Sequence, residues 1–197
     1  MRIAKLIISL LIGALPLGNY VLAEENWGQF KGDIVATFLS DGRNMRIERP
    51  FSYIDPGGRE WAVPAGMTTD GASVPRFFWT AFPPFTGRYR AAAVVHDYYC
   101  QLRTHTWRET HEIFYTGTRA AGEGEITAKA MYAAVYVFGP RWGIGTSPRG
   151  PGTDKYVTDD QQQAFYRDLE AWMKRENPSL QQIMEQLDQN AEVPKPR

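Results

Sequence analysis

The chain has 197 residues, of which 43% are hydrophobic and 22% are charged, and its 22 basic and 22 acidic residues give a formal net charge of zero. This balance argues against general nucleic-acid binding, which needs a basic surface. The length is enough for one domain with a real hydrophobic core, but hardly for two full domains.

The first 23 residues have the pattern of a secretory signal peptide. Arg2 and Lys5 form a basic start, residues 6–17 are mostly apolar, and residues 21–23 are typical of a cleavage site. The apolar run is shorter than the roughly 20 residues of a membrane span. We therefore expect an exported protein, periplasmic or secreted, with no transmembrane span in the mature chain; an uncleaved anchor is the alternative. Cleavage removes two basic residues and no acidic one, which leaves a net charge of −2.

The segment from Gly28 to Pro64 is typical of a small antiparallel β meander. Apolar and polar side chains alternate around residues 34–38, and Asp41-Gly42 is a hairpin turn signal. A second pair of short strands flanks another turn at residues 55–58. The proline-rich and glycine-rich stretch that follows predicts an ordered loop.

Helical patterns dominate the rest of the chain. The first predicted helix covers residues 88–102, the second begins at Thr106, and the third covers residues 127–138. Thr106 and Glu109 have the spacing of a capping box, in which each side chain bonds the backbone of the other residue.

The chain after the third helix predicts a loop and then more helix. Residues 139–152 contain five glycines and three prolines, a further helix covers residues 158–173, and Pro178 separates it from a short amphipathic stretch at residues 180–187. The sequence thus predicts an α+β fold, in which a small antiparallel β meander is followed by an antiparallel helix hairpin, a third helix and a C-terminal helical extension. The predicted division is a signal peptide at 1–23, an α+β domain at 24–140, a Gly/Pro loop at 141–157, a helical extension at 158–190 and a disordered tail at 191–197.

The helix hairpin gathers the residues with the most chemistry. Its link is only about three residues long, so the two helices should run antiparallel. His96 and His111 are equally far from the link and should face each other, while Cys100 follows His96 by one helical turn. Asp97 lies about 100° round the helix from His96, on the side where the loop of Asp70 could dock.

Two motifs carry a resemblance to a known family. Residues 64–75 read PAGMTTDGASVP and residues 96–100 read HDYYC. From about Gly28 to Gly139 the chain resembles a bacterial and phage family known as domain of unknown function 1353, whose marks are PxGxxTDGASxP and HDYxY. The last Tyr of the second mark is Cys100 here.

A shorter similarity connects the hairpin with secreted phospholipase A2, especially its bacterial and fungal branch. That resemblance implies that His96 is a general base acting on water and that Asp97 binds Ca²⁺ together with the loop of Asp70, Gly71 and Ser73. It also implies a lipid or other ester as substrate. The chain departs from the phospholipase pattern at both supporting positions: a histidine, residue 111, replaces a carboxylate, and a cysteine, residue 100, replaces a tyrosine.

These departures suggest a different metal. Two imidazoles and one thiolate are good ligands for Zn²⁺, so His96, Cys100 and His111 predict a tetrahedral site with Asp97, Asp70 or a water as the fourth ligand. With water as fourth ligand the site would be hydrolytic, and with a carboxylate it would be structural. A third hypothesis makes Cys100 a nucleophile that His96 or His111 deprotonates.

Each of these residues also has a purely structural interpretation. His111 lies on an apolar stripe and fits a core histidine, Asp97 fits a partner for a nearby arginine, and Asp70 fits a residue that shapes its turn. We expect an exported metal-dependent hydrolase-like protein that attacks an ester or amide bond. The alternative is a non-catalytic exported or phage-derived module that binds an envelope partner and keeps the His/Cys/Asp cluster as structure. An enzyme needs an open site beside His96, whereas a scaffold buries and pairs these groups.

Overall fold

The computed structural model of the chain describes residues 25–42, 44–70, 87–143 and 159–190. The predicted signal peptide, Gly71 and Ser73 of the candidate loop, most of the Gly/Pro loop and the tail lie outside these residues. The described part contains six strands and five helices, which confirms the predicted α+β class. The strands are β1 (Gln29–Lys31), β2 (Ala36–Phe38), β3 (Met45–Ile47), β4 (Phe51–Ile54), β5 (Glu60–Val63) and β6 (Thr68–Thr69).

The strands form two small antiparallel sheets instead of one continuous meander. One sheet has the order β1-β4-β5 and the other has the order β2-β3-β6. Both predicted hairpins are present, because β2 pairs with β3 and β4 pairs with β5. The first strand pairs with β4, and there Phe30 stacks on its cross-strand partner Tyr53 with ring centroids 5.0 Å apart. This long-range pair divides the predicted meander into two sheets.

The five helices lie close to their predicted positions. They are α1 (Arg90–Leu102), α2 (Trp107–Ala120), α3 (Glu125–Phe138), α4 (Asp159–Glu176) and α5 (Leu180–Asn190). The capping box at the start of α2 is complete: the backbone N–H of Glu109 donates to the Thr106 hydroxyl at 3.2 Å, and the backbone N–H of Thr106 donates to the Glu109 carboxylate at 3.0 Å. Local sequence therefore determines where α2 begins.

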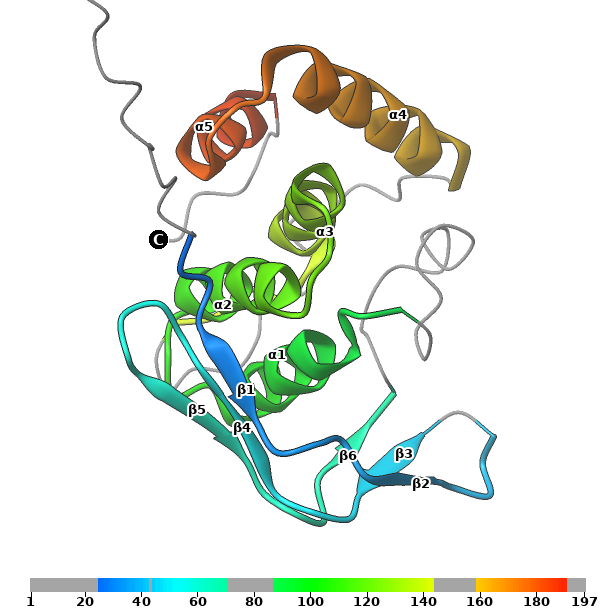
Figure 1. The fold of residues 1–197 in the computed structure, drawn as a ribbon. Coiled ribbons are helices and arrows are strands. Elements are labelled where there is room, and N and C mark those ends of the chain that lie inside the picture. The colour runs from blue at the N-terminus through cyan, green and yellow to red at the C-terminus, as the bar shows by residue number, and fades with distance from the viewer. Residues whose placement is uncertain (1–24, 43, 71–86, 144–158, 191–197) are drawn as a thin grey trace, which may run out of the picture.

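The elements are stacked in layers, as Figure 1 shows. The sheets lie against α1, α2 packs between α1 and α3, and α4 and α5 cover the far side of α3. Within the described residues no helix is both long enough and apolar enough to cross a membrane. The layers leave α1 and α2 as the central pair, in contact with strands on one side and with α3 on the other.

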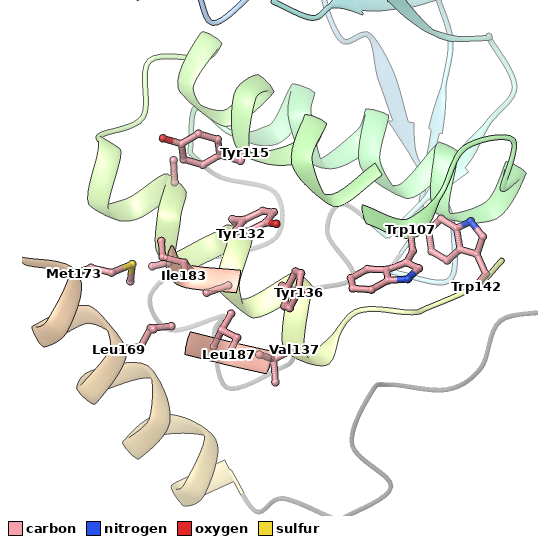
Figure 2. Packing of buried hydrophobic residues seen from close by; sticks show 13 residues of the cluster. Trp107, Tyr115, Tyr132, Tyr136, Val137, Trp142, Leu169, Met173, Ile183 and Leu187 are labelled. Atoms are coloured by element: carbon pink, nitrogen blue, oxygen red, sulfur yellow. The ribbon is translucent and has the colours of Figure 1, made fainter. Parts of the chain in front are cut away.

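Two apolar clusters stabilise the two ends of this stack. Side chains of the sheets, led by the buried Trp61 and Tyr53, pack against Val94 and Val95 of α1. At the other end, Figure 2 shows α4 and α5 placing apolar side chains against the tyrosines of α3. The labelled members of this second cluster are Trp107, Tyr115, Tyr132, Tyr136, Val137, Trp142, Leu169, Met173, Ile183 and Leu187.

Small residues allow α1 and α2 to lie close together. A Cβ placed on Gly117 of α2 would lie 3.1 Å from the Cβ of Ala92 in α1, so the helices nearly touch at this level. Ala92 therefore lies opposite Gly117, and one turn nearer the link His96 lies opposite His111. This pairing confirms the predicted antiparallel hairpin.

Candidate metal centre

Three side chains of the hairpin meet on its inner surface. The Nε2 atom of His96 lies 2.9 Å from the Nδ1 atom of His111, and the Sγ atom of Cys100 lies 3.5 Å from the same Nε2 atom. One ligand atom from each residue falls within 4.8 Å of the other two. Helical spacing in α1 and the antiparallel partner helix thus bring together the three residues that the sequence predicted to converge.

Aromatic rings enclose this cluster. The ring of His96 lies 5.0 Å from Phe114, while His111 lies 5.4 Å from Trp107 and 6.1 Å from Trp142, measured between ring centroids. His96 is 3% exposed and His111 is fully buried. Two surface hollows in the described part of the chain, of about 660 and 310 Å³, are lined by other residues. The two imidazoles are therefore enclosed within the described structure, whereas Cys100 is partly exposed.

Burial determines the charge of the two imidazoles. It lowers the pKa of His96 from 6.5 to about 4, and it lowers the pKa of His111 well below its ordinary value, with smaller contributions from His96 and Arg141. Both rings are therefore neutral at neutral pH, so the contact between them is a hydrogen bond between one N–H and one ring lone pair. The neutral imidazole is also the form that binds a metal ion.

The thiol of Cys100 is held in its protonated form. Burial, and after it the negative charge of Asp97, raises the pKa of Cys100 well above the ordinary value of 9.0. An activated cysteine nucleophile needs the opposite shift, toward a lower pKa. A bound cation would counter this shift, because metal coordination deprotonates a thiol.

The Nε2 atom of His111 is buried and faces the end of α3, since a Cβ placed on Gly139 would lie 2.9 Å away. Among the described residues it makes no well-formed hydrogen bond, and a weak hydrogen bond with the backbone of Pro140 only partly opposes the lowering of the pKa of His111. The same Cβ would lie 2.2 Å from the carbonyl oxygen of Val135. Only glycine fits at this position, because any side chain would displace either the end of α3 or the imidazole.

Asp97 lies on the other side of the His96 ring. Its Oδ1 atom is 4.0 Å from Nδ1 of His96, and its Oδ2 atom accepts a hydrogen bond of 2.6 Å from the hydroxyl of Thr69 in β6. Asp97 is 3% exposed, and Asp70 directly follows β6. The sequence correctly placed Asp97 toward this segment, but the atoms that converge with Cys100 are those of the two histidines.

The distances in the cluster suit a tetrahedral zinc site. Zinc–nitrogen bonds of about 2.0 Å and zinc–sulfur bonds of about 2.3 Å require edges of about 3.3 Å between nitrogens and about 3.5 Å between nitrogen and sulfur. Two of the three observed separations are 2.9 Å, between the imidazole nitrogens, and 3.5 Å, between His96 and Cys100, and the third, between Cys100 and His111, is within 4.8 Å. To hold an ion, the imidazoles would have to separate by a few tenths of an ångström and Cys100 would have to lie about 3.5 Å from the His111 nitrogen.

Some residues around the cluster were missed by sequence reasoning. The sequence predicts only a loop at Gly139, and it gives no sign of the contact between Thr69 and Asp97. The one available signal was the glycine directly after the apolar helix that ends at Phe138, because glycine at a helix end often marks a close backbone approach.

The fold and the cluster together define an α+β domain with a His–Cys–His group buried across a helical hairpin. Residues 45–135 match the model of the family described as "Protein of unknown function (DUF1353)", and this segment of the chain belongs to that family. The match confirms the resemblance predicted from the TDGASVP and HDYYC motifs. It includes all of the hairpin and most of α3.

Two relatives come from Sinorhizobium fredii (strain NBRC 101917 / NGR234). The protein named "Uncharacterized protein y4jT" is 40% identical over 152 residues, which are 74% of this chain and 45% of that protein. "Uncharacterized protein y4iH" is 40% identical over 131 residues, which are 64% of this chain and 53% of that protein. The chain thus spans about half the length of these relatives. No solved structure matches it significantly.

Proposed function

We propose that this chain is a metal-binding module in which His96, Cys100 and His111 hold one transition-metal ion, with Zn²⁺ as the preferred candidate. The observation that carries the proposal is the convergence of two neutral imidazoles and one thiol within 4.8 Å. Nitrogen and sulfur donors of this kind suit zinc, whereas Ca²⁺ prefers oxygen ligands. A calcium site built on Asp97 would have to draw on oxygen atoms of residues 71–73, which lie outside the described structure.

The burial of the site favours a structural ion over a catalytic one. A catalytic zinc keeps one position open to water and substrate, whereas a structural zinc is enclosed by the protein. His96 is 3% exposed, His111 is fully buried and three aromatic rings surround them, so the imidazole side of the site is enclosed and only Cys100 is partly exposed. In this function the ion connects α1 and α2 near their link and stabilises the module for contact with a partner, for which an envelope protein is our candidate.

A metal-dependent hydrolase is the second candidate. The observation in its favour is the number of protein ligands, because three ligands leave the fourth tetrahedral position to water, as in catalytic zinc sites. The ion would then lower the pKa of that water, and the substrate would be an ester, including a lipid, or an amide. Access to the water would come from the side of Cys100, which is partly exposed.

Export of the module is part of the proposal and is supported by the first 23 residues alone, with their basic start, apolar run and small-residue cleavage site. Metal binding through a thiolate is compatible with such a compartment, because a lone cysteine has no second cysteine in the chain to pair with. Coordination would also protect the thiol from oxidation.

The test is the metal content of the protein purified from expression of the full chain without chelators. We expect about one zinc per chain, and less than a tenth of that in His111→Ala and in Cys100→Ser. The matched control is His105→Ala, since His105 stacks on Trp61 outside the cluster, with ring centroids 4.4 Å apart, and its loss should leave the zinc in place.

Two results would reject the proposal. One is a folded wild-type protein that contains no transition metal and takes up none when zinc is added. The other is equal zinc content in wild type and in both cluster variants. Ester and amide hydrolysis that depends on the ion would move the conclusion to the second candidate.

A further inference from the structure

Asp97 is a buried carboxylate that contacts the cluster without belonging to it. Its Oδ1 atom lies 4.0 Å from Nδ1 of His96, which is the ring nitrogen opposite the one that faces His111. A hydrogen bond would require a separation of about 3 Å, so the present contact is electrostatic. The carboxylate therefore acts on the cluster through its charge and through the ring of His96.

The position of this carboxylate is fixed from outside the hairpin. The Thr69 hydroxyl of β6 donates to Oδ2 of Asp97 at 2.6 Å, and β6 itself pairs with β3. Gln101, one turn further along α1, donates to the carbonyl oxygen of Thr68 at 3.3 Å. The sheet thus keeps Asp97 beside His96, at a place where the carboxylate is 3% exposed and its field is little weakened by water.

Charge distinguishes the metal ions that this set of donors accepts. Two neutral imidazoles and one thiolate also suit Cu⁺, which is monovalent and prefers soft ligands. A single thiolate balances the charge of Cu⁺ but leaves a divalent ion one negative charge short. The carboxylate of Asp97 supplies a second negative charge next to the cluster, and its field already reaches Cys100.

We infer that Asp97 is the residue that makes this site select a divalent ion over Cu⁺, acting as a neighbour of the ligand His96 and not as a ligand. The inference rests on the proposed metal site. A carboxylate that accepts a hydrogen bond from a coordinating imidazole typically contributes about 10-fold to 100-fold to metal affinity. Asp97 lies 4.0 Å from the ring and acts through its charge alone, so this range is the upper limit for its removal. Electrostatic energy scales with the charge of the ion, so Cu⁺ should lose only about the square root of that factor, roughly 3-fold to 10-fold.

The experiment compares the affinities of the full protein for Zn²⁺ and Cu⁺, measured anaerobically by competition with coloured chelators. The variants are Asp97→Asn, which removes the charge at nearly constant shape, and Asp97→Glu, which keeps it. We expect the ratio of Zn²⁺ affinity to Cu⁺ affinity to fall by about 3-fold to 10-fold in Asp97→Asn. The ratio should stay within about twofold of wild type in Asp97→Glu. Should Asp97→Asn not fold, Asp97→Ser serves as the neutral variant, because a serine hydroxyl is small and can still bond Thr69.

The outcomes separate this inference from the proposed function. If wild type binds neither ion, the metal site itself is absent, and both ideas fall. If wild type binds Zn²⁺ but the neutral variant binds both ions as wild type does, or loses affinity for both by the same factor, the site stands and the role of Asp97 is refuted. The role of Asp97 would also be refuted if the ratio of Zn²⁺ affinity to Cu⁺ affinity fell equally in Asp97→Glu, since that variant keeps the charge.

Discussion

The interface between α1 and α2 differs in kind from the interface between α3 and the α4–α5 pair. The first contains the imidazoles of His96 and His111, which face each other, and α2 also carries two buried hydroxyls, those of Thr110 and Thr118, without a hydrogen-bond partner among the described residues. The second is apolar in its centre, with Met173 and Ile183 fully buried. Its polar groups are paired: Lys129 donates to Asn177 at 2.7 Å and Tyr136 donates to Asp188 at 2.9 Å.

The difference indicates where this molecule is stabilised and where it carries its chemistry. Apolar burial stabilises the outer layer, whereas each unsatisfied buried polar group costs on the order of 1–3 kcal/mol. A hairpin selected only for stability would replace these groups with apolar side chains. The two facing imidazoles beside Cys100 support a site in this interface, and we expect it to be the weaker of the two interfaces in the absence of a ligand.

The largest expected effect on stability is at the apolar interface. Replacing the fully buried Met173 by alanine should lower the free energy of unfolding by about 2–5 kcal/mol, because it leaves a cavity between α3 and α4. Urea unfolding followed by circular dichroism measures this change, and the exposed Gln189→Ala serves as the control with an expected change below about 0.5 kcal/mol. Zinc content should not change; a loss of zinc in Met173→Ala would show that the two interfaces are coupled.

Acid should weaken the hairpin interface of the metal-free protein. The pKa of His96 is about 4 in the folded protein and 6.5 as its ordinary value, so between these pH values the unfolded chain binds a proton that the folded protein excludes. The free energy of unfolding should therefore fall as pH decreases from 6.5 to 4, by roughly 3 kcal/mol in total. The lowered pKa of His111 acts in the same direction.

Urea unfolding at several pH values in the presence of a chelator measures this slope. Met173→Ala should keep the wild-type slope, because its cavity lies in the other interface. His96→Gln cannot titrate in this range and should show a shallower slope. An unchanged slope in His96→Gln would assign the acid sensitivity to other groups.

The smallest expected effect is a gain in stability. Thr110 is fully buried and its hydroxyl is unpaired among the described residues, so Thr110→Val should raise the free energy of unfolding by about 1 kcal/mol. The matched control is Thr116→Val on the same helix, because the hydroxyl of Thr116 donates to the carbonyl oxygen of Ile113 at 3.4 Å and that contact would be lost. Thermal unfolding of the two variants would contradict the comparison if Thr110→Val were the less stable one.

Local features of the fold could be predicted from the sequence, and long-range strand pairing could not. The Thr106–Glu109 capping box and the turn at Asp41-Gly42 involve residues a few positions apart, and both are present as expected. The pairing of β1 with β4 joins segments more than 20 residues apart. Nothing in the alternation of apolar residues distinguishes that pairing from a simple meander, because the inward-facing residues are the same in both.

In the candidate site, too, local features could be predicted from the sequence and long-range contacts could not. His96, Cys100 and His111 could be placed together because two helical periods and one short link determine their positions. The contact of Thr69 with Asp97 depends on how a sheet packs against α1, and the fit of Gly139 against His111 depends on where α3 ends. These tertiary contacts have no periodic signal in the sequence.

The indole N–H of Trp142 donates to the carbonyl oxygen of His105 at 2.8 Å. This hydrogen bond connects the link before α2 with the segment after α3. Residues 105–142 therefore form a closed loop of chain that contains α2 and α3. The N-terminal cap of α2 is formed by Thr106 and Glu109, both within this loop. We expect such a contiguous unit to behave as a foldon, a segment that opens and closes cooperatively. His111 belongs to that unit, while His96 and Cys100 belong to α1 outside it. In hydrogen exchange, a bound ion should therefore increase protection in α1 more than in α2, because it would fasten α1 to a unit that is already closed.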